Sequence, residues 1–366
     1  MSQKPSSRFP SRPVAQLLGS NGPVHALTYS SSPGTYILTG SSDRSIRLYN
    51  PASTSPVYPP SNTITSRPQT APPPQGKLIQ TYTQHSHEVL SLAVSPTNAL
   101  FASAGGDRAV LLWDVATAQT VRRFGASSTA HSHTGRVNAV TFLGGGEDVV
   151  VSAGLDCTVR VWDARSNNPR PIQVLSEAKD AVTALAPGDA EILAGSVDGR
   201  VRSYDIRMGR CVADTFPASV TSVWLARDGR TVLVGTLDSK VRLMDRRDGS
   251  CLKTYEAQGR RNEELRVQSV LGGGEGWVVA GDEMTGSETE GNEGRIWAWD
   301  VLTGKVVAKV AVPWGSGNEN RKRIIGRDGK EKERENVVSC IAWRDGGFGD
   351  QFCAGGTSGV VTVFGV

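Results

Sequence analysis

One pattern of about 40 residues recurs along most of this 366-residue chain and limits the possible folds more than any other feature. Each copy has an apolar segment, a segment of small residues, a turn containing Asp, a β-branched segment and an aromatic–Asp pair. The copies lie at 23–50, 85–114, 133–163, 181–205, 219–245, 267–300 and 337–365. The sequence therefore predicts seven equivalent structural units.

Within each unit, apolar and polar residues alternate with a period of two, as in Val159, Arg160 and Val161, which indicates β-strands. A small sheet of this kind must bury both faces against its neighbours, so the units are expected to form a ring. The last unit ends after three strands, at Phe364, and residues 13–19 form an additional strand before the first unit. We therefore predict an all-β, seven-bladed β-propeller, closed by this N-terminal strand pairing into the last blade.

The domain prediction that follows is a single propeller over 13–366, preceded by a disordered segment over 1–12. The pairs Trp113–Asp114 and Trp162–Asp163 are typical of WD40 repeats. In blades of that type, a His, a Ser or Thr, the turn Asp and the Trp commonly form a buried hydrogen-bonded chain. Two repeats contain all four residues: His85, Ser103, Asp107 and Trp113, and His133, Ser152, Asp156 and Trp162.

A serine hydrolase is the competing interpretation of these Ser, His and Asp residues. Their spacing repeats with the blade, however, and a fully satisfied buried polar network stabilises a fold. The chain also lacks the G-x-S-x-G motif that places a nucleophile on a sharp turn. We therefore predict a structural network and a protein that is not an enzyme.

Metal and cofactor sites are also not expected. The His-Ser-His pairs at 85–87 and 131–133 could chelate a metal from one strand face, but one His of each pair belongs to the predicted network. No Cys or carboxylate stands at matching spacing. The glycine runs 144–146 and 272–274 lack the Lys-Ser/Thr of a phosphate-binding loop.

The composition restricts the kinds of partner and the cellular compartment that we expect for this protein. The net charge of +4 is too small to indicate direct nucleic-acid binding by itself. No segment approaches the roughly 20 apolar residues that cross a bilayer, and the N-terminus has no apolar signal region. The five Cys stand singly in apparent strands, as small buried residues in a reducing compartment. We expect a cytoplasmic and nuclear protein.

Three segments exceed the repeat. Residues 51–76 are rich in Pro, Ser and Thr and are either a solvated spacer or a docking or phosphorylation segment. Residues 282–294 form an acidic turn, and 314–335 form a loop of mixed charge whose basic cluster, 321–323, could also be a nuclear address. Blade geometry places these two charged loops on the same face, where they attract each other or flank a binding surface.

The resemblance becomes more specific in the central repeats. The runs LSEAKDAVTALA (175–186), EILAGSVDGRVRSYDIRMG (191–209), SAGGDRAVLLWDVATAQTVRRF (103–124) and LDSKVRLMDRRDG (237–249) are similar to the mitogen-activated protein kinase organizer family, WD repeat-containing protein 83. The likeness covers most of the chain except the three additional segments. It implies a scaffold that assembles MAP-kinase signalling complexes and associates with the spliceosome, with kinases or splicing factors as partners.

Four arginines are candidate protein-binding residues. Arg165 and Arg207 end two consecutive repeats, as Trp-Asp-Ala-Arg and Tyr-Asp-Ile-Arg. This ending resembles the motif by which many propellers dock on the adaptor of a cullin-RING ubiquitin ligase, which is the alternative function. Arg200 and Arg202 are expected to face an acidic partner, or else to form a solvated strand face. We expect the protein to be a monomer.

Overall fold

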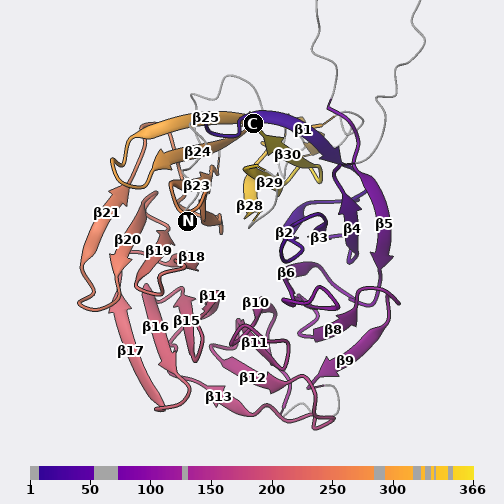
Figure 1. The fold of residues 1–366 in the computed structure, drawn as a ribbon, viewed down its shortest axis with the longest axis vertical. Coiled ribbons are helices and arrows are strands. Elements are labelled where there is room, and N and C mark those ends of the chain that lie inside the picture. Colours follow the sequence, from indigo (N-terminus) through magenta and orange to yellow (C-terminus); the bar gives the residue numbers. More distant parts are fainter. Residues whose placement is uncertain are drawn as a thin grey trace, which may run out of the picture.

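The computed structural model describes residues 8–52, 73–125, 131–283, 293–315, 335–344 and 349–366, together with the strands at 323–325 and 331–333. Over these ranges the chain forms strands and turns only, and no helix is long and apolar enough to cross a membrane. Seven four-stranded antiparallel sheets stand around a central axis (Figure 1). The predicted all-β, seven-bladed propeller is confirmed.

Each sheet is one blade, with its strands in order from the innermost to the outermost. Blade 1 contains β2 (Val24–Tyr29), β3 (Ile37–Ser41), β4 (Ile46–Asn50) and β5 (Lys77–Tyr82). Blade 2 contains β6 (Val89–Val94), β7 (Leu100–Gly105), β8 (Val110–Asp114) and β9 (Thr120–Phe124). Blade 3 contains β10 (Val137–Phe142), β11 (Val149–Gly154), β12 (Val159–Asp163) and β13 (Gln173–Leu175). Blade 4 contains β14 (Val182–Pro187), β15 (Glu191–Ser196), β16 (Arg200–Asp205) and β17 (Arg210–Thr215).

The remaining blades follow the same order. Blade 5 contains β18 (Val220–Leu225), β19 (Thr231–Thr236), β20 (Val241–Asp245) and β21 (Cys251–Tyr255). Blade 6 contains β22 (Ser269–Gly272), β23 (Trp277–Gly281), β24 (Gly294–Asp300) and β25 (Val306–Val312). Blade 7 contains β28 (Val338–Trp343), β29 (Gln351–Gly356), β30 (Val361–Gly365) and β1 (Arg12–Leu17). A separate hairpin, β26 (Arg323–Ile325) with β27 (Glu331–Glu333), lies in the connection from blade 6 to blade 7.

The two ends of the described chain meet in blade 7. Strand β1 pairs antiparallel with β30, with Gln16 opposite Thr362 and Leu17 opposite Val361. The other edge of β1 bonds the end of the Pro-rich segment: Gln16 N–H donates to Pro74 O at 2.9 Å, and Gly76 N–H donates to Gln16 O at 2.8 Å. The predicted closing strand is therefore present, and it has backbone partners on both edges.

The inner strands share one irregularity that explains the small residues of the second strands. In six blades the pairing register shifts just after the first residue of the inner strand. This bulge brings backbone close to the end of the second strand, where a Cβ on Gly105 would lie 2.3 Å from Glu88 O. A Cβ on Gly154 would lie 2.3 Å from Arg136 O. Glycine is required at these positions because no side chain fits.

The bulged residues also link neighbouring blades. The side chain of Asn138 donates to Val182 O at 2.8 Å, and that of Thr183 donates to Val220 O at 2.6 Å. Apolar clusters fill the spaces between blades, as the repeat pattern requires, so the core is a ring of contacts rather than one centre. Each blade is thus stabilised by the next one.

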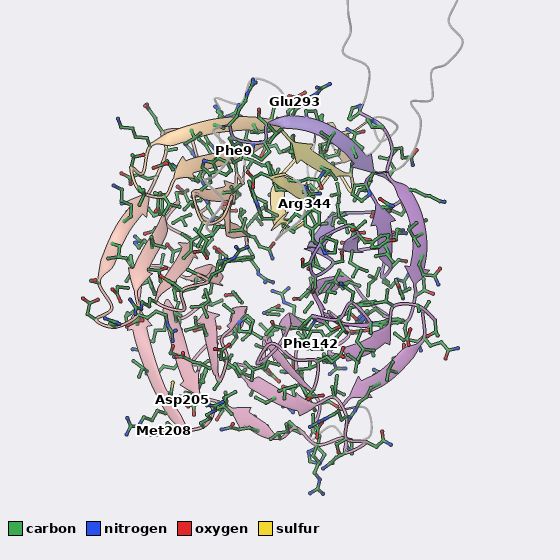
Figure 2. All side chains as sticks on the ribbon, in the orientation of Figure 1. Phe9, Phe142, Asp205, Met208, Glu293 and Arg344 are labelled. Carbon is green, nitrogen blue, oxygen red and sulfur yellow. The ribbon has the colours of Figure 1, made fainter. Side chains whose placement is uncertain are left out.

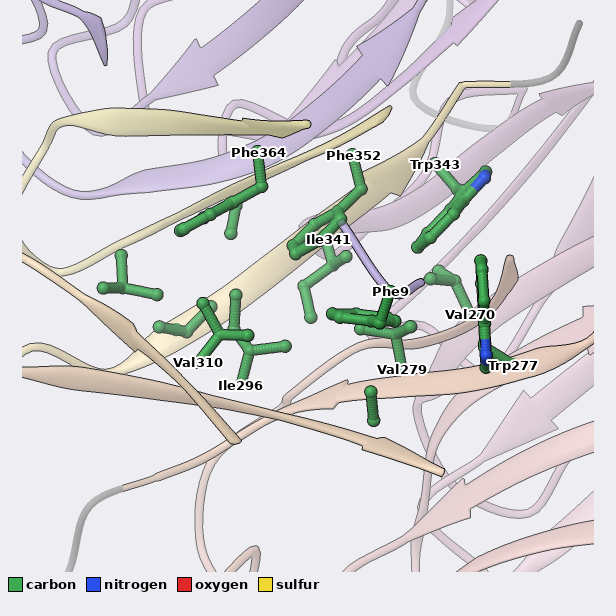
Figure 3. Close-up of a cluster of buried hydrophobic side chains, with 14 residues drawn as sticks. Phe9, Val270, Trp277, Val279, Ile296, Val310, Ile341, Trp343, Phe352 and Phe364 are labelled. Carbon is green, nitrogen blue, oxygen red and sulfur yellow. The ribbon is translucent and has the colours of Figure 1, made fainter. Parts of the chain in front are cut away.

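The N-terminal segment is more ordered than the sequence predicted. Phe9 is only 5% exposed and packs between blades 6 and 7, with its ring centroid 5.5 Å from that of Trp277 and 5.6 Å from that of Phe352 (Figure 3). The predicted disordered segment over 1–12 is therefore wrong from Phe9 onward, because this aromatic side chain has an apolar site to fill. Residues 1–7 lie outside the described part of the chain.

Candidate interaction surfaces

The structure brings together the four network residues predicted in blade 2. His85 Nδ1 lies 2.8 Å from Asp107 Oδ2, and His85 Nε2 lies 2.7 Å from Ser103 Oγ. Trp113 Nε1–H donates to the same Ser103 Oγ at 2.8 Å. One assignment satisfies all the atoms: Nδ1–H donates to the carboxylate, and the Ser hydroxyl donates to Nε2. Ser103 is completely buried, so its hydroxyl cannot reach a substrate.

Blade 3 repeats this arrangement. His133 lies 2.9 Å from Asp156 and 2.8 Å from Ser152, and Trp162 Nε1–H donates to Ser152 at 2.8 Å. Burial alone would raise the pKa of Asp156, but hydrogen bonds from His133 and Thr158 and from a backbone N–H lower it to about 2. Burial lowers the pKa of His133 against the opposing effect of Asp156. The network therefore holds an ionised Asp and a neutral His at pH 7.

A second kind of buried network replaces the first in blade 4. Arg202 is 3% exposed, and its Nη2–H donates to Asp198 Oδ2 at 2.6 Å while its Nη1–H donates to Ser196 Oγ at 2.7 Å. Burial raises the pKa of Asp198, but hydrogen bonds from Arg202 and Ser196 outweigh it and lower the pKa to about 2. The prediction that Arg202 is an accessible binding residue is wrong, because Asp198 holds its guanidinium inside the blade.

The same network occurs in blades 1 and 5. Its members are Ser41, Asp43 and Arg47 in blade 1 and Thr236, Asp238 and Arg242 in blade 5. The sequence carried a signal for all three networks, namely the repeated spacing Ser/Thr-x-Asp-x-x-x-Arg. It was missed because arginine in a strand is usually solvated.

The acidic turn of blade 6 is less acidic at the surface than expected. Asp282 is 1% exposed and accepts a hydrogen bond from Trp297 Nε1–H at 2.9 Å. Glu283 is fully buried, and its carboxylate accepts the backbone N–H groups of Glu263 and Glu264 at 2.7 and 3.1 Å. These two carboxylates stabilise the fold, and only Glu293 of the described acidic residues of this turn is exposed. Glu288 and Glu290 lie outside the described residues, as does most of the loop over 314–335.

The other arginine candidates differ in exposure. Arg165 is exposed and lies 3.3 Å from Asp148 in an open ion pair. Arg207 is exposed as well. Its sequence neighbours Asp205 and Met208 lie on the outer part of blade 4 (Figure 2). Arg200 is half-buried. Arg165, Arg207 and Arg200 therefore remain candidates with different accessibilities.

The His-Ser-His pairs do not converge on a metal site. His85 and His133 are committed to the blade networks, whereas His87 is exposed and lies 3.2 Å from Ser86 Oγ. Among the described residues, no group of three or more His, Cys, Asp or Glu side chains is placed to hold a metal. The expectation of no metal and no cofactor stays a prediction.

Two of the cysteines correct a sequence expectation. Cys340 and Cys353 are buried, but Cys211 and Cys251 are exposed, and Cys157 is partly exposed in a turn. The exposed pair lies on β17 and β21, which are outermost strands with one edge facing solvent. The prediction that all five are buried is therefore wrong.

Two hollows could receive partners. A polar groove of about 730 Å³ lies over the turns that join the first and second strands of blades 2–5. Its lining includes Asp189, Arg227 and Asp228, together with Arg246 and Glu191, which form an ion pair. The central channel, of about 640 Å³, is lined by the inner strands of all seven blades. Neither hollow was predicted from the sequence, because both are made by residues from several blades.

Comparisons with known proteins agree with this geometry. A family model described as "WD domain, G-beta repeat" matches residues 11–50, 76–114 and 126–163. WD repeat domain-containing protein 83 of Rattus norvegicus is 36% identical over 316 residues, which cover 86% of this chain and 87% of the relative. This chain belongs to the WD repeat domain-containing protein 83 family.

Other relatives extend the comparison. The WD repeat domain-containing protein 83 homolog of Dictyostelium discoideum is 26% identical over 322 residues, covering 80% of this chain and 86% of the relative. Pre-mRNA-splicing factor cwf17 of Schizosaccharomyces pombe is 28% identical over 167 residues, covering 35% of this chain and 48% of the relative. The propeller with its β1 closure is thus a member of a WD40 family, and none of these three relatives has an enzyme's name.

Proposed function

We propose that this protein is a non-catalytic scaffold that holds other proteins in multiprotein complexes, as a monomer in the cytoplasm and nucleus. Membership of the WD repeat domain-containing protein 83 family across nearly the whole ring carries this proposal. The buried Ser, His and Asp groups support it, because they stabilise blades and are not accessible as catalytic groups. Loops on a rigid ring are well suited to recognition.

Pre-mRNA splicing is the setting that the comparisons favour. A similar protein carries the name pre-mRNA-splicing factor, although the match covers only about a third of this chain. The family resemblance adds assembly of MAP-kinase complexes as a second form of the same scaffold function. In either form the partner is a protein, and the propeller supplies surfaces rather than chemistry.

Affinity purification of the tagged full chain from native extract, followed by mass spectrometry, tests this proposal. A tagged unrelated seven-bladed propeller, purified in parallel, removes proteins that bind any ring of this type. We expect enrichment of spliceosomal proteins or of MAP-kinase components over that control. A set of bound proteins identical to that of the control propeller would contradict the scaffold proposal.

Docking on a cullin-RING adaptor is the alternative, and one observation favours it. Arg165 and Arg207 follow turns of the same geometry: Asp163 accepts the N–H of Arg165 at 2.9 Å, and Asp205 accepts the N–H of Arg207 at 2.9 Å. Both side chains are exposed, on consecutive blades. The two backbone turns are therefore alike, and both carry an exposed arginine that a common partner could contact.

A binding assay with purified adaptor decides this alternative. The double variant Arg165→Ala/Arg207→Ala should lose adaptor binding, while Arg230→Ala, an exposed arginine of blade 5, should retain it. Failure of the unmodified protein to bind adaptor, or equal binding by the double variant, would eliminate the docking alternative without affecting the scaffold proposal.

A further inference from the structure

The central channel contains one basic side chain whose position the fold alone does not explain. Arg266 lies three residues before β22, the inner strand of blade 6, and its side chain reaches across the axis to blade 3, where Nη1–H donates to Asn138 O at 2.9 Å. Asn138 is the bulged residue of β10, so its carbonyl lies outside the regular strand pairing. The bulge thereby makes an acceptor available to a side chain from the opposite wall.

The guanidinium of Arg266 is not neutralised by the protein. Its Nε–H is shielded from solvent and has no acceptor. Across the described part of the chain, no carboxylate lies within the 4.0 Å of an ion pair with Arg266. An arginine has five N–H donors in a planar fork, and within the described ranges only one of them has a protein acceptor.

Other basic groups lie near this end of the channel. Burial, together with the like charge of Arg136 from blade 3, lowers the pKa of Arg266 to about 10. His25 of blade 1, whose pKa is lowered first by burial, also experiences the positive charge of Arg266, together with the negative charge of Glu88. Arg136 and Arg266, from blades 3 and 6, thus bring two positive charges to this end of the channel, and Glu88 is a nearby carboxylate that opposes them.

We propose that Arg266 is the centre of a binding site for a small oxyanion, a phosphate or carboxylate group, inside the channel. Arg266 is partly exposed to the channel, and an oxyanion would pair there with the Nη N–H groups that have no protein acceptor. The planar fork matches the two oxygens of a carboxylate or phosphate, and weak screening in the channel strengthens the attraction. A channel of about 640 Å³ is in the size range of small-ligand sites.

This site is independent of the scaffold proposal, because it uses the channel wall and not the outer loops. It also differs from the structural arginines Arg47, Arg202 and Arg242, each of which is paired with an Asp of its own blade. Arg260 likewise has no carboxylate within ion-pair distance among the described residues, but two of its N–H groups have backbone acceptors, Gly281 O and Ser239 O, whereas Arg266 has one.

Calorimetry with inorganic phosphate, at constant ionic strength maintained with chloride, tests the site on the full chain. We expect saturable binding with one phosphate per chain, at least tenfold weaker in Arg266→Met and unchanged in Arg230→Met, an exposed arginine of blade 5. Acetate in place of phosphate determines whether a carboxylate also binds. Absence of saturable binding of both anions, or equal phosphate binding by Arg266→Met, would overturn the proposal.

Crystals of the unmodified protein soaked in selenate provide a test that needs no variant, in case Arg266→Met does not fold. Selenate is a tetrahedral oxyanion whose selenium gives an anomalous signal. A peak within hydrogen-bond distance of the Arg266 guanidinium is the expected result. Selenate peaks confined to the outer surface would contradict the assignment.

Discussion

Arg202 and Asp198 form an ion pair inside blade 4, with Nη2 2.6 Å from Oδ2, whereas the corresponding turn carboxylates of blades 2 and 3 are hydrogen-bonded to a histidine. In every one of these blades an Asp at the turn between the second and third strands accepts hydrogen bonds from a buried side chain. The turn carboxylate is therefore the constant feature of the three blades, and the side chain hydrogen-bonded to it is a His in blades 2 and 3 and an Arg in blade 4.

Removing the arginine from this pair should destabilise the protein. Arg202→Ala leaves the Asp198 carboxylate without its charged partner in a mostly buried site, which should lower the free energy of unfolding by ~3 kcal/mol. Arg207→Ala, on the same blade but exposed, should change it by less than about 0.5 kcal/mol. Urea unfolding followed by fluorescence compares the two variants, and equal stabilities would refute the structural role of Arg202.

Ser152 of the blade 3 network should contribute to the stability of the protein, because it is hydrogen-bonded to both His133 and Trp162. Ser152→Ala removes the acceptor of Trp162 Nε1–H and the donor to His133, which should cost about 1–3 kcal/mol of unfolding free energy. Ser176→Ala, an exposed position between blades 3 and 4, is the matched control. Thermal unfolding measures both, and an unchanged melting temperature for Ser152→Ala would show that the network is not stabilising.

Phe9 should hold the N-terminal segment against blades 6 and 7. Phe9→Ala leaves a cavity beside Trp277 and Trp343, and a core Phe→Ala change typically costs about 3–5 kcal/mol. Detachment of the segment should also expose the two indoles and shift tryptophan fluorescence to longer wavelength. Ser11→Ala, an exposed neighbour, should do neither, and a Phe9→Ala spectrum identical to that of the unmodified protein would exclude the anchor.

Acid should weaken the fold in two pH ranges. Hydrogen bonding lowers the pKa of Asp43, Asp156 and Asp198 to about 2, from an ordinary value of 3.8, despite their burial. Their stabilisation is complete above pH 3.8 and is lost as the pH falls toward 2, because the unfolded chain takes up these protons first. His133, with a pKa lowered by burial, adds a loss that begins below pH 6.5 for the same reason.

Urea unfolding at a series of pH values between 7 and 2.5 measures this dependence. The free energy of unfolding should fall below pH 6.5 and more steeply below pH 3.8. Asp156→Asn should flatten the steeper part relative to the unmodified protein. A free energy of unfolding independent of pH over the whole range would show that these groups have the same pKa in the folded and unfolded chains.

The fold was predictable because its signals are periodic. Seven copies of one pattern indicated seven blades, and the isolated strand at 13–19 matched the missing outer strand of the last blade. The His-containing networks were predictable for the same reason, since Ser152, Asp156 and Trp162 keep the spacing of Ser103, Asp107 and Trp113. A residue pattern that recurs once in each blade therefore indicates contacts that are made within one blade.

The sequence-based predictions were wrong or incomplete for residues that contact a distant part of the ring or a partner that the sequence pattern did not reveal. Arg202 looked solvated because its burial depends on the placement of Asp198 across a turn. Asp282 and Glu283 looked like members of an exposed acidic run, but Trp297 and two backbone N–H groups bind them. Arg266 is positioned by blade 3, which lies 128 residues away in sequence, and no local pattern indicates such a contact.

Native-state hydrogen exchange over β1 and β30 tests most directly that one strand from the N-terminus closes the ring. The amide hydrogens that β1 and β30 share should be protected together, and they should become exchangeable at the same denaturant concentration as those of β28 and β29. A shared transition is the result that the closed propeller predicts. Exchange of residues 12–17 within seconds in native buffer, while β28–β30 stay protected, would contradict it.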